Sequence, residues 1–290
     1  MRFQKIDLHM HSTVSDGTDS PEEILARVQE AGIDLFSVTD HDAINCGERI
    51  PKLLKTGDPG FIAGVEFSCR DEEGKYHILG YGYDPEAETI RATVRFGHES
   101  RMDKVCQRLE FLKTEFGFAF PENEIAALLA LDNPGKPHIG NLLVKLGYAE
   151  TKEKAIRDFI DKANVKARYL RPEEAIRAIS ESGGVPVLAH PFYGSGDEMI
   201  LGGEMEARLR RLTEYGLRGV EVFYSGFTDK LRRQALELAE RYGLYVTAGS
   251  DYHGKNKLMV ELGDTGLDGA EEYPDGLRRF LKDVKIFEVT

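Results

Sequence analysis

The chain has 290 residues, 41% of them hydrophobic and 30% charged, which is the balance of an ordinary globular protein. The 50 acidic and 38 basic residues give a formal net charge of −12, which argues against binding to long nucleic acids or to a membrane, because both need a basic face. A small anionic substrate held by a few local cations is compatible with this charge. Three scattered cysteines, with no apolar leader and no membrane-spanning stretch, lead us to expect a cytoplasmic protein.

The first 94 residues combine short apolar segments with a helical pattern. Residues 20–23, Ser-Pro-Glu-Glu, supply an N-cap, a proline in the first turn and two acidic side chains, which predicts a helix that ends at Gly32. Other segments are short, apolar and bounded by turn residues, which is typical of strands. Strands are therefore predicted at 5–9, 34–40, 61–67 and 76–83.

The middle of the chain has a different pattern. Residues 95–166 are helical and charged, without a convincing strand, and we interpret them as a helical insertion. Strand and helix signals then alternate again, which favours an α/β fold with a parallel sheet, as a barrel or a doubly wound sheet. The predicted helices are 171–182, 205–215, 229–242 and 275–283, and the predicted strands are 185–190, 219–223, 244–250 and 284–289.

Residues that bind metal ions stand at or near the ends of most predicted strands. In a parallel barrel these ends meet at one mouth, so we expect the side chains to converge there. Imidazole and carboxylate groups without thiolate suit zinc, manganese or iron, and a carboxylate such as Glu66 can bridge two ions about 4 Å apart. The residues concerned are His9, His11, Asp16, Asp40, His41, Glu66, His77, His190, Asp251 and His253.

Several motifs resemble those of the PHP superfamily, named for the polymerase and histidinol phosphatase domain. They are D-L-H-M-H-S-T-V-S-D-G at 7–17, V-T-D-H-D at 38–42, L-A-H-P at 188–191 and G-S-D-Y-H-G at 249–254. The resemblance implies a distorted (β/α)7 barrel built from residues 1–94 and 167–290. Residues 95–166 would then form a helical insertion that acts as a lid.

The resemblance also implies a centre of two or three divalent ions, with manganese, zinc and iron as the candidates. One ion would take His9, His11, Glu66 and Asp251. A second would share Glu66 and take His77 and His190. A third would take Asp16, His41 and His253. Asp40 would orient a ligand or a bound water, and the third ion, His253 or Asp40 would assist the leaving oxygen.

The insertion is similar to that of stand-alone PHP phosphoesterases, which act on nucleotide-like molecules. This likeness implies hydrolysis of a nucleoside 3′,5′-bisphosphate or a cyclic ribose phosphate by a metal-bridged hydroxide. Lys136-Pro137-His138 resembles the basic segment that such enzymes place near the substrate phosphate, and Arg101 is a further phosphate candidate. The alternative for Arg101 and Lys136 is a solvated cation on a helix face.

Three other functions stay open at this point. An exonuclease on short oligonucleotides would use the same metal chemistry. A non-catalytic, metal-stabilised PHP module would be expected to have lost ligands, whereas all nine ligand positions are filled here. A carbonyl hydrolase on a related barrel is the third, and phosphate-binding cations at Arg101 and Lys136 would argue against it.

Overall fold

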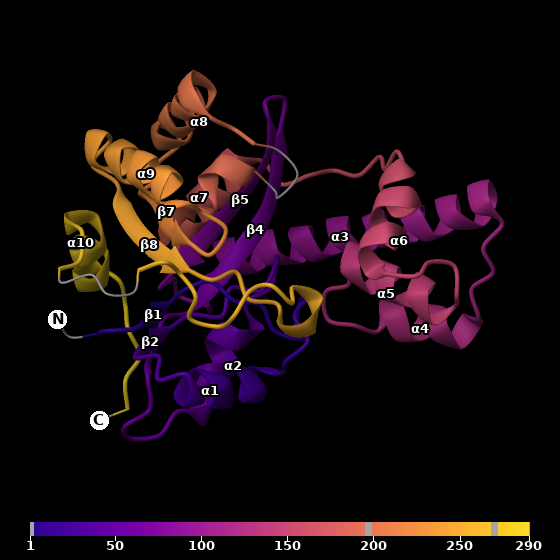
Figure 1. The fold of residues 1–290 in the computed structure, drawn as a ribbon, viewed down its shortest axis with the longest axis horizontal. Helices are drawn as coiled ribbons and strands as arrows, with labels where there is room; N and C mark the ends of the chain where they lie inside the picture. The colour runs from indigo at the N-terminus through magenta and orange to yellow at the C-terminus, as the bar shows by residue number, and fades with distance from the viewer. Residues whose placement is uncertain (1–2, 195–198, 268–271, 290) are drawn as a thin grey trace.

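The computed structural model describes residues 3–194, 199–267 and 272–289 (Figure 1). Its strands form a three-stranded sheet in the order β1-β2-β3 and a five-stranded sheet in the order β4-β5-β6-β7-β8. The strands are β1 Ile6–Asp7, β2 Leu35–Phe36, β3 Gly60–Phe61, β4 Gly64–Asp71, β5 Gly74–Tyr81, β6 Val185–Leu188, β7 Gly219–Tyr224 and β8 Tyr245–Gly249.

The pairing directions confirm an α/β fold with parallel strands, and they differ from a regular barrel in one region. The first sheet is parallel throughout, and so is β6-β7-β8. Strand β5 runs antiparallel to both β4 and β6, because the tight turn between β4 and β5 leaves no room for a crossover helix. Single bridges, Met10 to Tyr252 and His41 to Glu66, join the two sheets. Among the described residues, the hydrogen-bonded ladders thus form two sheets, and a closed barrel is not confirmed.

Helices cover the sheets on two sides. In Figure 1, α1 and α2 lie below the sheets, whereas α7, α8 and α9 lie above them. The predicted cap of α1 is present: the Ser20 amide donates to Glu23 Oε2 at 2.7 Å, and Ser20 Oγ accepts from the Glu23 amide at 3.3 Å. The helices are α1 Pro21–Glu30, α2 Asn45–Leu53, α7 Pro172–Glu181, α8 Gly202–Glu214, α9 Asp229–Arg241 and α10 Asp275–Asp283.

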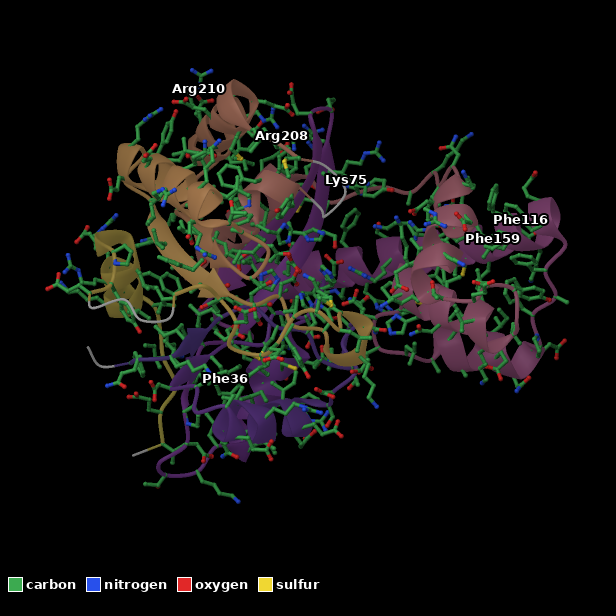
Figure 2. All side chains as sticks on the ribbon, in the orientation of Figure 1. Phe36, Lys75, Phe116, Phe159, Arg208 and Arg210 are labelled. Carbon is green, nitrogen blue, oxygen red and sulfur yellow. The ribbon has the colours of Figure 1, made fainter. Side chains whose placement is uncertain are left out.

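The middle of the chain forms a separate helical group with its own hydrophobic cluster, which includes Val105, Leu109 and Ile139. Helix α3 begins at Glu88, before the predicted start of the insertion, and runs from the main body into this group (Figure 1). Phe116 and Phe159 pack edge to face there, with ring centroids 5.1 Å apart (Figure 2). The helices are α3 Glu88–Phe116, α4 Glu122–Leu129, α5 Lys136–Lys145, α6 Lys152–Asp158 and the short η1 Ile160–Lys162.

Three sequence predictions differ from the structure in detail. Helix α2 was not predicted, since Gly47 and Pro51 inside it weaken the helical pattern. The strand predicted at 61–67 is divided between β3 and β4. The strand predicted at 284–289 is reduced to one bridge, between Phe287 and Phe61. Within the described parts of the chain, no helix is long and apolar enough to span a membrane.

Candidate metal centre

The nine predicted metal ligands lie together between the two sheets and the loops that follow them. Ligand atoms within three groups lie close enough to share an ion: each group's donor atoms are within 4.8 Å of one another. The groups are His11 with Asp16, His41 and His253; His9 with His11 and Asp251; and His41 with Glu66 and His77.

Glu66, on β4, is the centre of this arrangement. Its side chain is 1% exposed, and the hairpin of β4 and β5 fixes its position opposite Leu79. One carboxylate oxygen faces three imidazoles and the other faces two. The five ring nitrogens within 3.0–3.3 Å of these oxygens belong to His9, His11, His41, His77 and His190. A carboxylate between two sets of imidazoles can bridge two cations.

Two aspartates, Asp16 and Asp251, add carboxylate oxygens to the cluster beside His11. Asp251 Oδ1 lies 3.3 Å from His11 Nε2 and 3.4 Å from His9 Nε2. Asp16 Oδ1 lies 3.4 Å from His253 Nε2, and Asp16 Oδ2 lies 4.0 Å from His41 Nε2. The described residues therefore offer nitrogen and oxygen donors for more than one ion.

The chemistry of these donors fits divalent cations. Four buried atoms that point into the cluster have no hydrogen-bond partner in the described structure: His9 Nε2, His11 Nε2, His41 Nδ1 and Glu66 Oε2. Buried polar atoms are normally satisfied, so such a group indicates a ligand. Burial raises the pKa of Glu66, but the surrounding histidines hold it well below its ordinary value, and the carboxylate is therefore ionised and ready to bind a cation.

Glu221, on β7, is a functional residue that the sequence reasoning missed. It is fully buried, its Oε1 accepts from His9 Nδ1 at 2.9 Å, and its Oε2 accepts from the His190 amide at 2.8 Å. A carboxylate on Nδ1 fixes the imidazole so that Nε2 faces the cluster. The only signal in the sequence was a glutamate inside the apolar strand V-E-V-F-Y.

Replacing Glu221 by glutamine is expected to weaken metal binding about 10- to 100-fold. Glutamine keeps the size of the side chain but loses the charge that orients His9. Titration of chelator-treated protein with Mn²⁺ measures this effect. Glu240→Gln, an exposed change on α9, is the control; equal affinities for the two variants would refute a positioning role for Glu221.

Asp40 supports the loop that carries two ligands. Its Oδ1 accepts from the Ser12 amide at 2.8 Å and from Ser15 Oγ at 2.7 Å, and its Oδ2 accepts from Ser12 Oγ at 2.7 Å and Cys46 Sγ at 3.1 Å. Ser15 Oγ in turn lies 3.4 Å from both His11 Nδ1 and Asp16 Oδ1. Both Asp40 oxygens are therefore engaged by the loop, whereas His253 lies in the cluster itself.

The predicted phosphate ligands are brought near the centre, but each has an internal partner. Arg101 donates to Asp42 Oδ2 at 2.7 Å, and Lys136 Nζ lies 2.5 Å from Asp161 Oδ1. His138 Nδ1 accepts from the Gly135 amide at 3.0 Å, which caps α5. Arg101 and Lys136 line a cavity beside the cluster; within the described ranges, His138 lines neither of the two cavities that meet at the cluster.

Two cavities meet at the cluster and share His41 and His77. The first, which we call the metal cleft, has a volume of about 590 Å³ and is lined by most of the candidate ligands together with Lys152, Tyr224 and Lys257. Lys257 Nζ lies 2.5 Å from Asp251 Oδ2 and 3.1 Å from Tyr224 OH. The second, which we call the basic chamber, has a volume of about 880 Å³. Buried ionisable groups beside an open cleft are typical of a catalytic site.

Comparison with known protein families identifies the family of the chain that carries this cluster. Residues 7–215 match the model of the PHP domain. The chain belongs to the PHP domain family. The match spans β1 to α8 and includes seven of the nine candidate ligand positions, all except Asp251 and His253, and it takes in the whole helical insertion.

Curated relatives of this PHP protein are phosphoesterases with different substrates. It is 32% identical over 274 residues to a phosphoribosyl 1,2-cyclic phosphate 1,2-diphosphodiesterase from Eggerthella lenta, covering 89% of this chain and 97% of the relative. It is 29% identical to a 3′,5′-nucleoside bisphosphate phosphatase from Chromobacterium violaceum, covering 90% and 91%. It is 27% identical to a 5′-3′ exoribonuclease from Haemophilus influenzae, covering 89% and 96%.

A solved structure supports the same conclusion. A protein from Bifidobacterium adolescentis, described as a metal-dependent phosphoesterase, superposes with a TM-score of 0.81 at 28% identity, covering 97% of each chain. The PHP protein is therefore a hydrolytic, metal-dependent phosphoesterase. This removes the non-catalytic module and the carbonyl hydrolase from the functions that the sequence left open.

Proposed function

We propose that this PHP protein hydrolyses a small nucleotide-like phosphate ester, either a nucleoside 3′,5′-bisphosphate or a cyclic ribose phosphate. The observation that carries the proposal is the Glu66 carboxylate with five imidazole nitrogens within 3.0–3.3 Å of its oxygens. Both candidate substrates are the printed activities of relatives that align over about nine tenths of this chain.

We assign the ligands to two or three divalent ions. His9, His11, Glu66 and Asp251 would hold the first, and Glu66 with His77 and His190 would hold the second. Asp16, His41 and His253 would hold a third. The three donor groups found among the described residues contain imidazole and carboxylate but no cysteine, which supports manganese, zinc or iron. When bound, such ions supply an activated water and neutralise charge on the phosphoryl group.

Side chains of the protein would hold the metal ligands and the reacting phosphate in position. Glu221 holds the His9 ring so that Nε2 faces the cluster. Asp40 holds the loop that carries His11 and Asp16. His253 lines the metal cleft with Nε2 beside Asp16, and we place it next to the leaving oxygen. We give Asp40 a supporting role because both its oxygens are engaged by the loop.

We propose that residues 95–166 act as a lid on a distorted (β/α)7 barrel made of 1–94 and 167–290. Contacts between the helical group and the loop after His253 support this assignment. Asn141 Nδ2 lies 3.4 Å from Asn256 Oδ1, and Lys152 Nζ donates to the Asn256 carbonyl. The insertion would therefore bound the cleft and set the size of the ester that fits.

The test is hydrolysis by Mn²⁺-loaded protein of three compounds, with the products separated by chromatography: adenosine 3′,5′-bisphosphate, which would give phosphate and a mononucleotide, a cyclic ribose phosphate, which would give the ring-opened phosphate, and a 5′-phosphorylated triadenylate, which would give adenosine 5′-monophosphate. We expect the highest kcat/KM with one of the first two. A preference for the trinucleotide would replace the proposed function by the exonuclease. No hydrolysis of any of them would refute both.

A further inference from the structure

The basic chamber is an unusual surface for a chain with a net charge of −12. It lies beside the metal cleft, and among the described residues Asp161 is the only acidic side chain in its wall. Lys75, one of its cations, lies on β5 (Figure 2). The cations in the wall are Arg70, Lys75, Arg101, Lys104, Arg108 and Lys136. A basic cavity in an acidic protein indicates an anionic ligand.

Lys104 and Arg108 are the wall cations on α3 that have no carboxylate within salt-bridge distance among the described residues. Arg101 is paired with Asp42, and Lys136 is paired with Asp161. Within the described parts of the chain, neither Lys104 nor Arg108 makes a salt bridge or a hydrogen bond through its side chain. Both lie on α3, four residues apart, so they project from the same helix face.

The surroundings of Lys104 hold its ammonium group in position but provide no carboxylate within salt-bridge distance among the described residues. Its Nζ lies 4.5 Å from the centre of the Tyr169 ring, and the Arg70 guanidinium lies 5.1 Å from the same ring. Burial and the nearby Arg101 lower the pKa of Lys104 to about 8. Cations that are gathered and partly buried without a counterion destabilise the empty chamber, and an anion would relieve this cost.

We propose that Lys104 and Arg108 bind the phosphate of the neighbouring nucleotide when the substrate is a short single-stranded oligonucleotide with its terminal phosphate at the metal centre. This inference rests on the metal-dependent centre of the proposed function and extends the same site beyond one nucleotide, so that it also accommodates the oligonucleotide alternative. The chamber and the metal cleft share His41 and His77, so a bound chain can pass from one into the other.

The size of the chamber and the layout of its cations agree with this occupant. At about 880 Å³ the chamber is as large as the sites that hold drug-sized ligands, much larger than a lone phosphate needs. Arg101 and Arg108 are seven residue steps apart on α3, about 10 Å along the helix axis, and Lys104 lies between them. A row of cations beside an aromatic side chain is typical of grooves that bind single-stranded nucleic acid.

The kinetic test compares two substrates in the variant K104A/R108A. We expect the ratio of kcat/KM for 5′-phosphorylated triadenylate to kcat/KM for adenosine 3′,5′-bisphosphate to fall about tenfold or more, since charged phosphate contacts are lost. The exposed Lys113→Ala on the same helix is the matched control and should leave the ratio unchanged. An unchanged ratio in the double variant, whether both substrates weaken equally or neither does, would overturn the proposal.

A binding measurement separates this inference from the proposed function. Fluorescence anisotropy of labelled triadenylate with chelator-treated protein, at several salt concentrations, gives the slope of log K against log salt. Removing two phosphate contacts should reduce the magnitude of this slope by about 1.4, and Lys113→Ala should not change it. Equal slopes would overturn the proposal even in an active enzyme, whereas a smaller slope would support it even if no bisphosphate is hydrolysed.

Discussion

Glu66→Gln is expected to lower the turnover of phosphate esters by about 10³-fold or more, because a bridging carboxylate supports several kcal/mol of metal-dependent stabilisation. Glutamine has the same shape but lacks the charge that faces five imidazole nitrogens. The variant should keep its fold, since Glu66 lies among polar groups and not in the apolar core. Phosphate release and bound metal per chain measure the two losses together.

The control for this prediction is Glu73→Gln, an exposed change at the turn of the same β4–β5 hairpin. It should retain the activity and metal content of the unaltered protein. Circular dichroism and thermal melting check that both variants are folded. If Glu66→Gln turns over substrate at a near-normal rate with its metal content intact, Glu66 does not bridge the ions.

Gly249→Ala is expected to destabilise the protein by about 3 kcal/mol, at the upper end of overpacking costs, and to lower metal affinity. Gly249 ends β8 beside β1, and a Cβ there would lie 2.2 Å from the His9 Cβ and 2.6 Å from Glu221 Oε1. Glu221 lies on β7 and the His9 backbone lies just after β1, so relief requires moving His9 away from the cluster. Urea denaturation and Mn²⁺ titration measure the two effects.

Gly203→Ala is the matched change for comparison. Gly203 lies in α8, and nothing lies within 4 Å of a Cβ built on it, so alanine there should be neutral or slightly stabilising. If Gly249→Ala unfolds like Gly203→Ala and binds Mn²⁺ as tightly as the unaltered protein, the close packing of β8 against His9 is not needed for the site.

The sequence predicted the cluster well because strand ends and short motifs are local features. His9 and His11 are two residues apart just after β1, and Asp251 and His253 follow β8, so their convergence could be inferred from the fold class alone. Glu221 could not be found in this way, because its role depends on β7 lying near His9 and His190 in space. Nor does a sequence show whether a cation already has a carboxylate partner.

Because the sequence does not show which cations have carboxylate partners, it favours Arg101 and Lys136 as phosphate-binding residues and does not single out Lys104 and Arg108. Their partners, Asp42 and Asp161, are 59 and 25 residues away along the chain, so the pairing is visible only in the folded protein. The same holds for the sheets: the antiparallel place of β5 depends on its pairing with β6, more than 100 residues later. Local patterns predict elements, whereas pairing between distant elements decides the topology.

The most direct test of the account is to restore metal to chelator-treated protein. Mn²⁺ is added in steps, and phosphate release from adenosine 3′,5′-bisphosphate is measured beside the metal bound per chain. The account predicts no release without metal and full release once two or three ions are bound per chain. Release that is unaffected by complete metal removal, or full activity with less than one ion per chain, would contradict it.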